Sequence, residues 1–100
     1  MIQRIVLLKL EDPFTTAEVR AEVAAYSRRV LGALPQVAAV NVGTPADEAG
    51  AGDWDLSLVL HFASTDDLEP FREHPDHRAY VDEYLKPKLA CLKAWNFLIP

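Results

Sequence analysis

Residues 55–62 read DLSLVLHF, and this stretch decides the fold because its side chains alternate in character. The even-numbered positions are all apolar, and they are Leu56, Leu58, Leu60 and Phe62. The odd-numbered positions are more polar, and they are Asp55, Ser57, Val59 and His61. Successive side chains of a β-strand point to opposite faces of a sheet. The alternation therefore predicts a strand over Asp55–Phe62 with one strongly apolar face.

The N-terminal stretch Ile2–Leu10 predicts a second strand, because β-branched residues and leucines dominate it. Its even-numbered face carries Ile2, Val6, Leu8 and Leu10 beside one charged residue, Arg4. Its odd-numbered face carries Ile5 and Leu7 beside Gln3 and Lys9. In both strands the even-numbered face is the more apolar one. We therefore expect helices to cover the even-numbered faces.

A helix is predicted after Pro13, which ends the first strand because proline cannot donate to a β-ladder. Thr15 and Glu18 have the spacing of a capping box, with Thr15 as the N-cap. Apolar side chains then recur every three or four positions, at Val19, Val23, Tyr26 and Val30. This stripe is typical of an amphipathic helix, and Gly32 is a natural stop.

Two more helices are predicted between residues 64 and 85. The sequence Ser64–Asp67 is a helix-capping pattern, and Pro70 limits the helix that follows to a short one. Pro75 suits the first position of a longer helix that ends near Leu85, before Pro87.

Strands at Val37–Val42 and at residues 91–99 complete the set, with a small, polar loop over residues 43–53. The element order is β-α-β-β-α-α-β. This order predicts one α+β domain over residues 1–100, with a ferredoxin-like, four-stranded antiparallel sheet and helices on one face.

The odd-numbered face of this sheet would remain uncovered. We expect it to carry Ile5, Leu7, Val37, Val59 and Trp95 or its neighbours. An exposed apolar patch of this size is uncommon on a soluble monomer. The pattern therefore predicts a homodimer in which two copies pack sheet against sheet.

Composition excludes several classes of partner. Fifteen acidic and ten basic residues give a formal net charge of −5, which argues against binding to nucleic acid or to an anionic membrane. No apolar run approaches the roughly 20 residues that span a bilayer. Cys91 is the only cysteine, which predicts no intrachain disulfide and a cytoplasmic location.

Two of the three histidines lie in the stretch EHPDHR, residues 73–78. With Pro75 at the first helical position, His74 becomes the cap and His77 lies in the first turn, so their imidazoles point in different directions. No other cluster has metal-ligand spacing, and we expect neither a metal site nor a cofactor.

Three side chains have the chemistry of a site. His77 shares a helix face with Tyr80, Val81 and Tyr84, which indicates either a buried structural histidine or a neutral base beside a cavity. Arg4 interrupts an apolar face, so it must reach water, pair with a carboxylate or line a cavity, where an anionic ligand would pair with it. Tyr26 is either a core aromatic or a hydroxyl donor to the same space.

The sequence resembles the stress-responsive A/B barrel (Dabb) family, in the dimeric α+β barrel superfamily. The resemblance covers nearly the whole chain and is carried by MIQRIVLLKL, by Gly43, by DWDLSLVLHF and by LEPFREHPDHRAYVDEYLKP with its His-Pro-x-His motif. It implies a ferredoxin-like dimer whose two sheets close into a barrel. It also implies a pocket between sheet and helices, and here the pocket would be lined by Arg4, Val6, Leu8, Leu58, Phe71 and Tyr80.

One member of that family is a plant polyketide cyclase that makes olivetolic acid. The resemblance implies catalytic roles for His77 and Tyr26, which match two of its four site positions. The other two positions differ, because Arg4 stands for a histidine and Phe71 for a tyrosine. Arginine stays charged and cannot replace a neutral histidine as acid or base, and phenylalanine has no hydroxyl.

Three functions are therefore compatible with the sequence. The first is a small-molecule binder with an apolar pocket for an aromatic or acyl ligand in each subunit. The second is a cofactor-independent, cyclase-like enzyme in which His77 removes a proton next to a carbonyl and Tyr26 or Arg4 stabilises the enolate. The third is a structural, stress-associated dimer whose pocket is filled by its own side chains.

Overall fold

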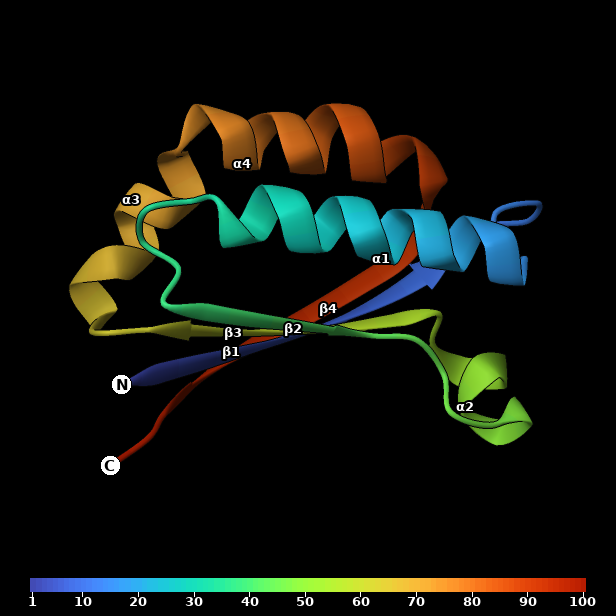
Figure 1. Cartoon of the computed structure of the whole chain (residues 1–100), viewed down its shortest axis with the longest axis horizontal. Coiled ribbons are helices and arrows are strands. Elements are labelled where there is room, and N and C mark those ends of the chain that lie inside the picture. Colours follow the sequence, from blue (N-terminus) through green and yellow to red (C-terminus); the bar gives the residue numbers. More distant parts are fainter.

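The computed structural model describes residues 1–100, and it consists of a four-stranded sheet with helices on one side (Figure 1). The strands are β1 Ile2–Leu10, β2 Ala39–Gly43, β3 Leu56–Phe62 and β4 Leu89–Leu98. The helices are α1 Ala17–Gly32, α2 Glu48–Asp53, α3 Leu68–Glu73 and α4 Pro75–Ala79. A π-turn at Tyr80–Leu85 continues α4, and 3-10 turns lie at Thr65–Asp67 and Lys86–Lys88.

The strand order is β2-β3-β1-β4, and every neighbouring pair is antiparallel. In the central register Val6 lies opposite Leu58 on one side and Ala94 on the other. Helices α1 and α4 run above the same face of the sheet, and the opposite face is open (Figure 1). The predicted ferredoxin-like α+β fold is confirmed.

The hydrophobic core lies between the sheet and the helices. Its strand residues are the even-numbered side chains of β1 and β3, as the alternation predicts: Ile2, Val6, Leu8, Leu10, Leu56, Leu58, Leu60 and Phe62. From the helical layer, buried side chains are Val23, Ala24, Leu31, Leu34, Phe71, Tyr80 and Leu85. No helix of the chain combines the length and the apolar character needed to cross a bilayer.

The N-cap of α1 differs from the prediction by one residue. Thr16, not Thr15, accepts a hydrogen bond from the Val19 N–H at 3.2 Å. The Thr15 hydroxyl instead donates to the Asp12 carboxylate at 2.9 Å. The sequence offers two adjacent threonines, and the turn before the helix uses the first of them.

Three other predictions are corrected at element ends. Strand β2 begins at Ala39 because the Val37 N–H donates to the Leu34 carbonyl, and Val37 packs against the core and not on the open face. Strand β4 begins at Leu89, two residues before the predicted start. Part of the predicted loop forms α2, where the Asp47 carboxylate caps the helix by accepting from the Gly50 N–H at 2.7 Å.

The π-turn changes which side chains of this helix face the sheet. At its end the Lys86 N–H bonds to the Val81 carbonyl, five residues back, so each turn holds more residues than an α-helical turn. The α-helical spacing predicts that Tyr84 lies on the side of His77. In the structure Leu85 takes the buried position and Tyr84 packs toward α1.

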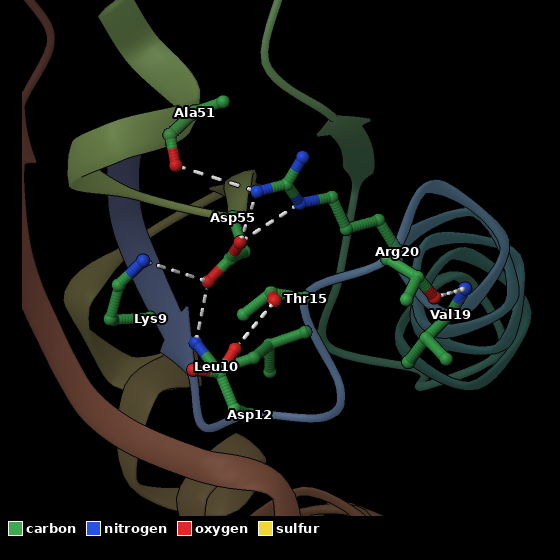
Figure 2. A network of polar contacts seen from close by, with 9 residues as sticks. Lys9, Leu10, Asp12, Thr15, Val19, Arg20, Ala51 and Asp55 are labelled. Atoms are coloured by element: carbon green, nitrogen blue, oxygen red, sulfur yellow. Dashed lines mark hydrogen bonds and ion pairs between the residues drawn. The ribbon is translucent and has the colours of Figure 1, made fainter. Parts of the chain in front are cut away.

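An ion pair between the buried Asp55 and the partly exposed Arg20 joins one end of the sheet to α1 (Figure 2). The Asp55 carboxylate is 0% exposed, although the alternation predicts Asp55 on the open face. It accepts hydrogen bonds from the Arg20 guanidinium at 2.6 and 2.8 Å and from the Leu10 N–H at 2.7 Å, and Lys9 Nζ lies 3.6 Å away. Burial opposes its ionisation, but the Leu10 N–H, Arg20 and Lys9 together hold the pKa of Asp55 below its usual value.

Candidate ligand cavity

A cavity of about 150 Å³ lies between the sheet and the α3–α4 segment. Nine of its eleven lining residues are hydrophobic, and only two, Arg4 and His77, are not. The hydrophobic wall is formed by Val6, Leu31, Leu58, Leu60, Phe71, Tyr80, Val81, Leu85 and Leu92. The cavity therefore combines an apolar wall with one cation and one imidazole.

Most of the residues predicted for a pocket meet at this cavity. They are Arg4, Val6, Leu58, Phe71, His77 and Tyr80. Leu8 is fully buried in the core and does not line the cavity. The functional roles of the six remain a prediction, since geometry alone assigns no ligand to them.

Tyr26 does not line the cavity. Its ring stacks on Tyr84 at a centroid distance of 3.9 Å, and the Arg29 guanidinium lies 5.0 Å from the Tyr26 centroid. The neighbouring residue Ser27 faces the interior instead, because the helix turns about 100° per residue. A role for the Tyr26 hydroxyl inside this cavity is thus not supported by its position.

Tyr80 is the tyrosine that reaches the cavity wall. Its hydroxyl and the Ser27 hydroxyl are 2.6 Å apart, and both residues are buried. Burial raises the pKa of Tyr80 to about 12, although the hydrogen bond to Ser27 favours ionisation. Tyr80 therefore stays protonated at any physiological pH.

His77 is held in one orientation by two contacts. Its Nδ1 lies 3.2 Å from the carbonyl oxygen of Arg72, and its ring centroid lies 4.3 Å from that of Phe71. A carbonyl can only accept, so Nδ1 carries the proton of the neutral ring and Nε2 keeps its lone pair.

The charges around His77 also favour the neutral form. Burial lowers the pKa of His77, and the nearby cations Arg4 and Arg78 lower it further, against the opposite effects of the Arg72 carbonyl and Asp82. His77 is therefore a neutral imidazole at pH 7. His74 has a separate role, because its Nδ1 accepts from the Asp76 N–H at 3.1 Å and caps α4, as predicted.

Arg4 reaches the cavity from β1, an inner strand of the sheet. It lies opposite Asn96 in the β1–β4 register, and its Nη1 donates to Asn96 Oδ1 at 3.1 Å. No carboxylate lies within ion-pair distance of it. Burial and then the neighbouring Arg72 lower the pKa of Arg4, but a guanidinium remains charged at pH 7.

Five lining residues were missed by the sequence reasoning as ligand contacts, namely Leu31, Leu60, Val81, Leu85 and Leu92. Leu60 lies on the same strand face as Leu58, and Val81 lies on the same helix side as His77. The sequence spacing could therefore have indicated these two residues as cavity contacts. Leu85 depends on the π-turn, and Leu92 depends on the register of β4 against β1. Neither feature has a sequence signature of its own.

The open face of the sheet carries its own apolar side chains. Trp95 is 44% exposed and Phe97 is 49% exposed, and Ile5 lies opposite both Trp95 and Val59. His61 lies on this face, with Nε2 3.4 Å from the Gln3 amide nitrogen. No group of three or more His, Cys, Asp or Glu side chains is placed to hold a metal ion.

Four antiparallel strands with every long helix on one side, and a cavity beneath those helices, define a ferredoxin-like α+β protein. The sequence model of the stress responsive A/B barrel domain (Dabb) matches residues 2–96. The chain therefore belongs to the Dabb family, and the resemblance noted in its sequence is confirmed.

Solved structures share this fold over nearly the whole chain. A dimeric ferredoxin-like protein of unknown function from Thermobifida fusca YX is 26% identical, with a TM-score of 0.81 over 98% of this chain and 90% of that one. A Dabb family protein from Mesorhizobium loti is 17% identical, with a TM-score of 0.81 over 99% and 96%. A hydroxynitrile lyase from Passiflora edulis is 16% identical, with a TM-score of 0.80 over 99% and 93%. No curated protein matches the sequence.

Proposed function

We propose that this protein is a homodimer that binds a small aromatic or acyl molecule in the cavity of each subunit. The observation that carries the proposal is the cavity lining, which is apolar except for Arg4 and His77. Binding sites for small molecules typically combine an apolar wall with a few polar groups that fix orientation.

The size of the cavity limits the ligand to about one ring. Pockets for drug-sized ligands have volumes of roughly 300–1,000 Å³, which is more than this cavity provides. An engineered apolar cavity of about 150 Å³ in another protein binds benzene. The volume of about 150 Å³ therefore favours a monocyclic aromatic molecule or a short acyl chain.

The homodimer is supported by the open face of the sheet. Ile5, Val59 and Trp95 lie side by side in the register, and Phe97 extends the patch. Burial of apolar surface contributes roughly 25 cal/mol per Å², which is a substantial gain for a small domain. The Thermobifida fusca neighbour is itself described as dimeric, which supports the same assembly here.

Cavity binding is tested by nuclear magnetic resonance with benzene-sized probes. We expect toluene and hexanoate to shift the methyl resonances of Leu58 and Leu60, which both line the cavity. Val81→Phe fills the cavity and should abolish these shifts, whereas Ala25→Val on the exposed side of α1 should leave them unchanged. Probes that shift only surface resonances, in both variants alike, would contradict the proposal.

A second candidate function is a cofactor-independent enzyme with His77 as its base. The observation that favours it is the hydrogen bond from Nδ1 to the Arg72 carbonyl, because this bond leaves the basic Nε2 available. Arg4 would stabilise the developing oxyanion. The same fold occurs in a hydroxynitrile lyase, so it is compatible with an enzyme site.

The proposed enzymatic function is tested by measuring the turnover of small aromatic β-keto acids and cyanohydrins. The expected result is a rate that His77→Ala lowers by about 100-fold or more, which is typical for loss of a general base. Val81→Phe should lower it as well, since it blocks the cavity. Equal rates for the wild type and His77→Ala would exclude His77 as the base.

A further inference from the structure

The charge of Arg4 has no counter-charge in the protein. It is partly buried at a mainly apolar cavity, and its one side-chain hydrogen bond goes to the neutral amide of Asn96. Taking a charge out of water without a partner of opposite sign is costly. A cation in this position is thus ready to receive an anion.

Two acidic side chains of the segment over the cavity already pair with other cations. Arg72 Nη1 lies 3.4 Å from Glu69 Oε2, and Arg78 Nη2 lies 2.8 Å from Asp82 Oδ2. These two pairs follow helical spacings of three and four residues, so they form within α3 and along α4. Neither carboxylate is within 4.0 Å of Arg4, which leaves Arg4 as the unpaired cation of the site.

The hydrogen bond to Asn96 also orients the Arg4 guanidinium so that it can make two hydrogen bonds to a ligand. Asn96 takes a hydrogen bond from Nη1, and the Nε and Nη2 groups make no hydrogen bond to the protein. A guanidinium edge of two parallel N–H groups matches the two oxygens of a carboxylate. Asn96 thus fixes the Nη1 group of Arg4, while the Nε and Nη2 groups remain free to bind a carboxylate.

We propose that the ligand of the cavity is a monocyclic aromatic or short aliphatic carboxylic acid, whose carboxylate pairs with Arg4. This inference rests on the proposed binding function and adds the charge of the ligand to it. The ring or chain occupies the apolar space beside Leu58 and Val81. His77 stays neutral in the free protein, so one anionic group balances the one charge that lines the cavity.

The test compares benzoate with benzamide, which has nearly the same shape and no charge. Dissociation constants are measured by isothermal titration calorimetry at pH 7 for the wild type and for Arg4→Met, a neutral variant of similar length. We expect benzoate to bind the wild type at least about tenfold more tightly than benzamide, as a charge-assisted contact provides. In Arg4→Met, benzoate should lose that advantage and benzamide should change less than about threefold.

Two further variants separate the pair from general effects. Arg28→Met removes an exposed cation of α1 and should leave both affinities unchanged. Arg4→Lys keeps the charge without the fork and should bind benzoate with intermediate affinity. If Arg4→Met does not fold, Arg4→Lys serves as the test variant in its place.

These experiments distinguish the charge of the ligand from the binding of any ligand in the cavity. Benzamide binding as tightly as benzoate, with no effect of Arg4→Met, would overturn the charge assignment and leave cavity binding intact. Failure of benzoate, benzamide and toluene alike to bind the wild type would overturn cavity binding itself, and the inference with it.

Discussion

The buried Asp55 and the partly exposed Arg20 form a two-point ion pair in which one carboxylate oxygen accepts from both Nε and Nη2 of the guanidinium, at 2.8 and 2.6 Å (Figure 2). Arg20 Nη2 also lies 3.4 Å from the Ala51 carbonyl of α2. The pair therefore connects α1, α2 and the start of β3 at one point. Neither residue lines the ligand cavity, and we expect the pair to act on stability.

Asp55→Asn should destabilise the protein by about 2 kcal/mol, because it removes charge-assisted hydrogen bonds to a buried carboxylate and leaves the partly buried Arg20 without its counter-charge. The measurement is urea unfolding at pH 7 and at a fixed protein concentration, since dimerisation makes stability depend on concentration. Asp53→Asn, two residues earlier and exposed, is the matched control and should change stability by less than about 0.5 kcal/mol. A similar small change in both variants would show that the pair contributes little.

The contribution of Asp55 should also depend on pH in a defined direction. Its pKa is lower in the folded state than the ordinary value near 3.9, so the unfolded chain takes up this proton first as the pH falls. The stabilisation is then complete above about pH 5 and decreases as the pH falls through 4 toward the folded pKa. The gap in unfolding free energy between wild type and Asp55→Asn should shrink from pH 6 to pH 3. A gap of constant size would contradict this account.

His77 should titrate below the ordinary histidine value of about 6.5, because burial and the cations Arg4 and Arg78 disfavour its charged form. In Arg4→Met one of those cations is gone, so the pKa of His77 should rise relative to the wild type. Nuclear magnetic resonance titration of the ring protons measures both values. The nitrogen shifts should also show the proton on Nδ1 at neutral pH. A His77 that titrates above 6.5, or carries its proton on Nε2, would rule out the proposed orientation.

The open sheet face should hold the dimer together, and Trp95→Lys places a charge on the part of this face that β4 forms. We expect the dimer dissociation constant to increase at least about 30-fold, as for other buried aromatic anchors. Analytical ultracentrifugation should then show the wild type at twice the 11.1 kDa chain mass and the variant shifted toward the single chain. Ala25→Lys on α1 is the control and should remain dimeric. A wild type that sediments as a monomer at 50 μM would refute this assembly.

The sheet could be predicted from sequence because alternation is a local property. In Ile2–Leu10 and Asp55–Phe62 the alternation of side chains indicates which strand face is buried. The apolar stripe over Val19–Val30 likewise indicates the buried side of the helix. The wrong face predicted for Asp55 depends on a contact that is distant in sequence. Asp55 is buried because Arg20, 35 residues earlier, neutralises it, and no pattern around Asp55 shows this.

The site could be predicted only in part for the same reason. Arg4 and His77 stand out as polar residues on apolar faces, and the structure brings them to one cavity. Tyr26 and Ser27 are adjacent on α1, and the packing against Tyr84 and Tyr80 decides which one faces inward. Leu85 replaces Tyr84 on the inner side because the π-turn alters the helical period.

Carboxylate binding in the cavity is tested by a crystal structure of the protein grown with saturating benzoate. We expect electron density for one aromatic ring between the sheet and α4, in contact with Leu58 and Val81. We also expect both carboxylate oxygens within hydrogen-bonding distance of the Arg4 guanidinium. A cavity that is closed by its own side chains, with Arg4 turned into solvent and no ring density inside, would contradict the proposed binding.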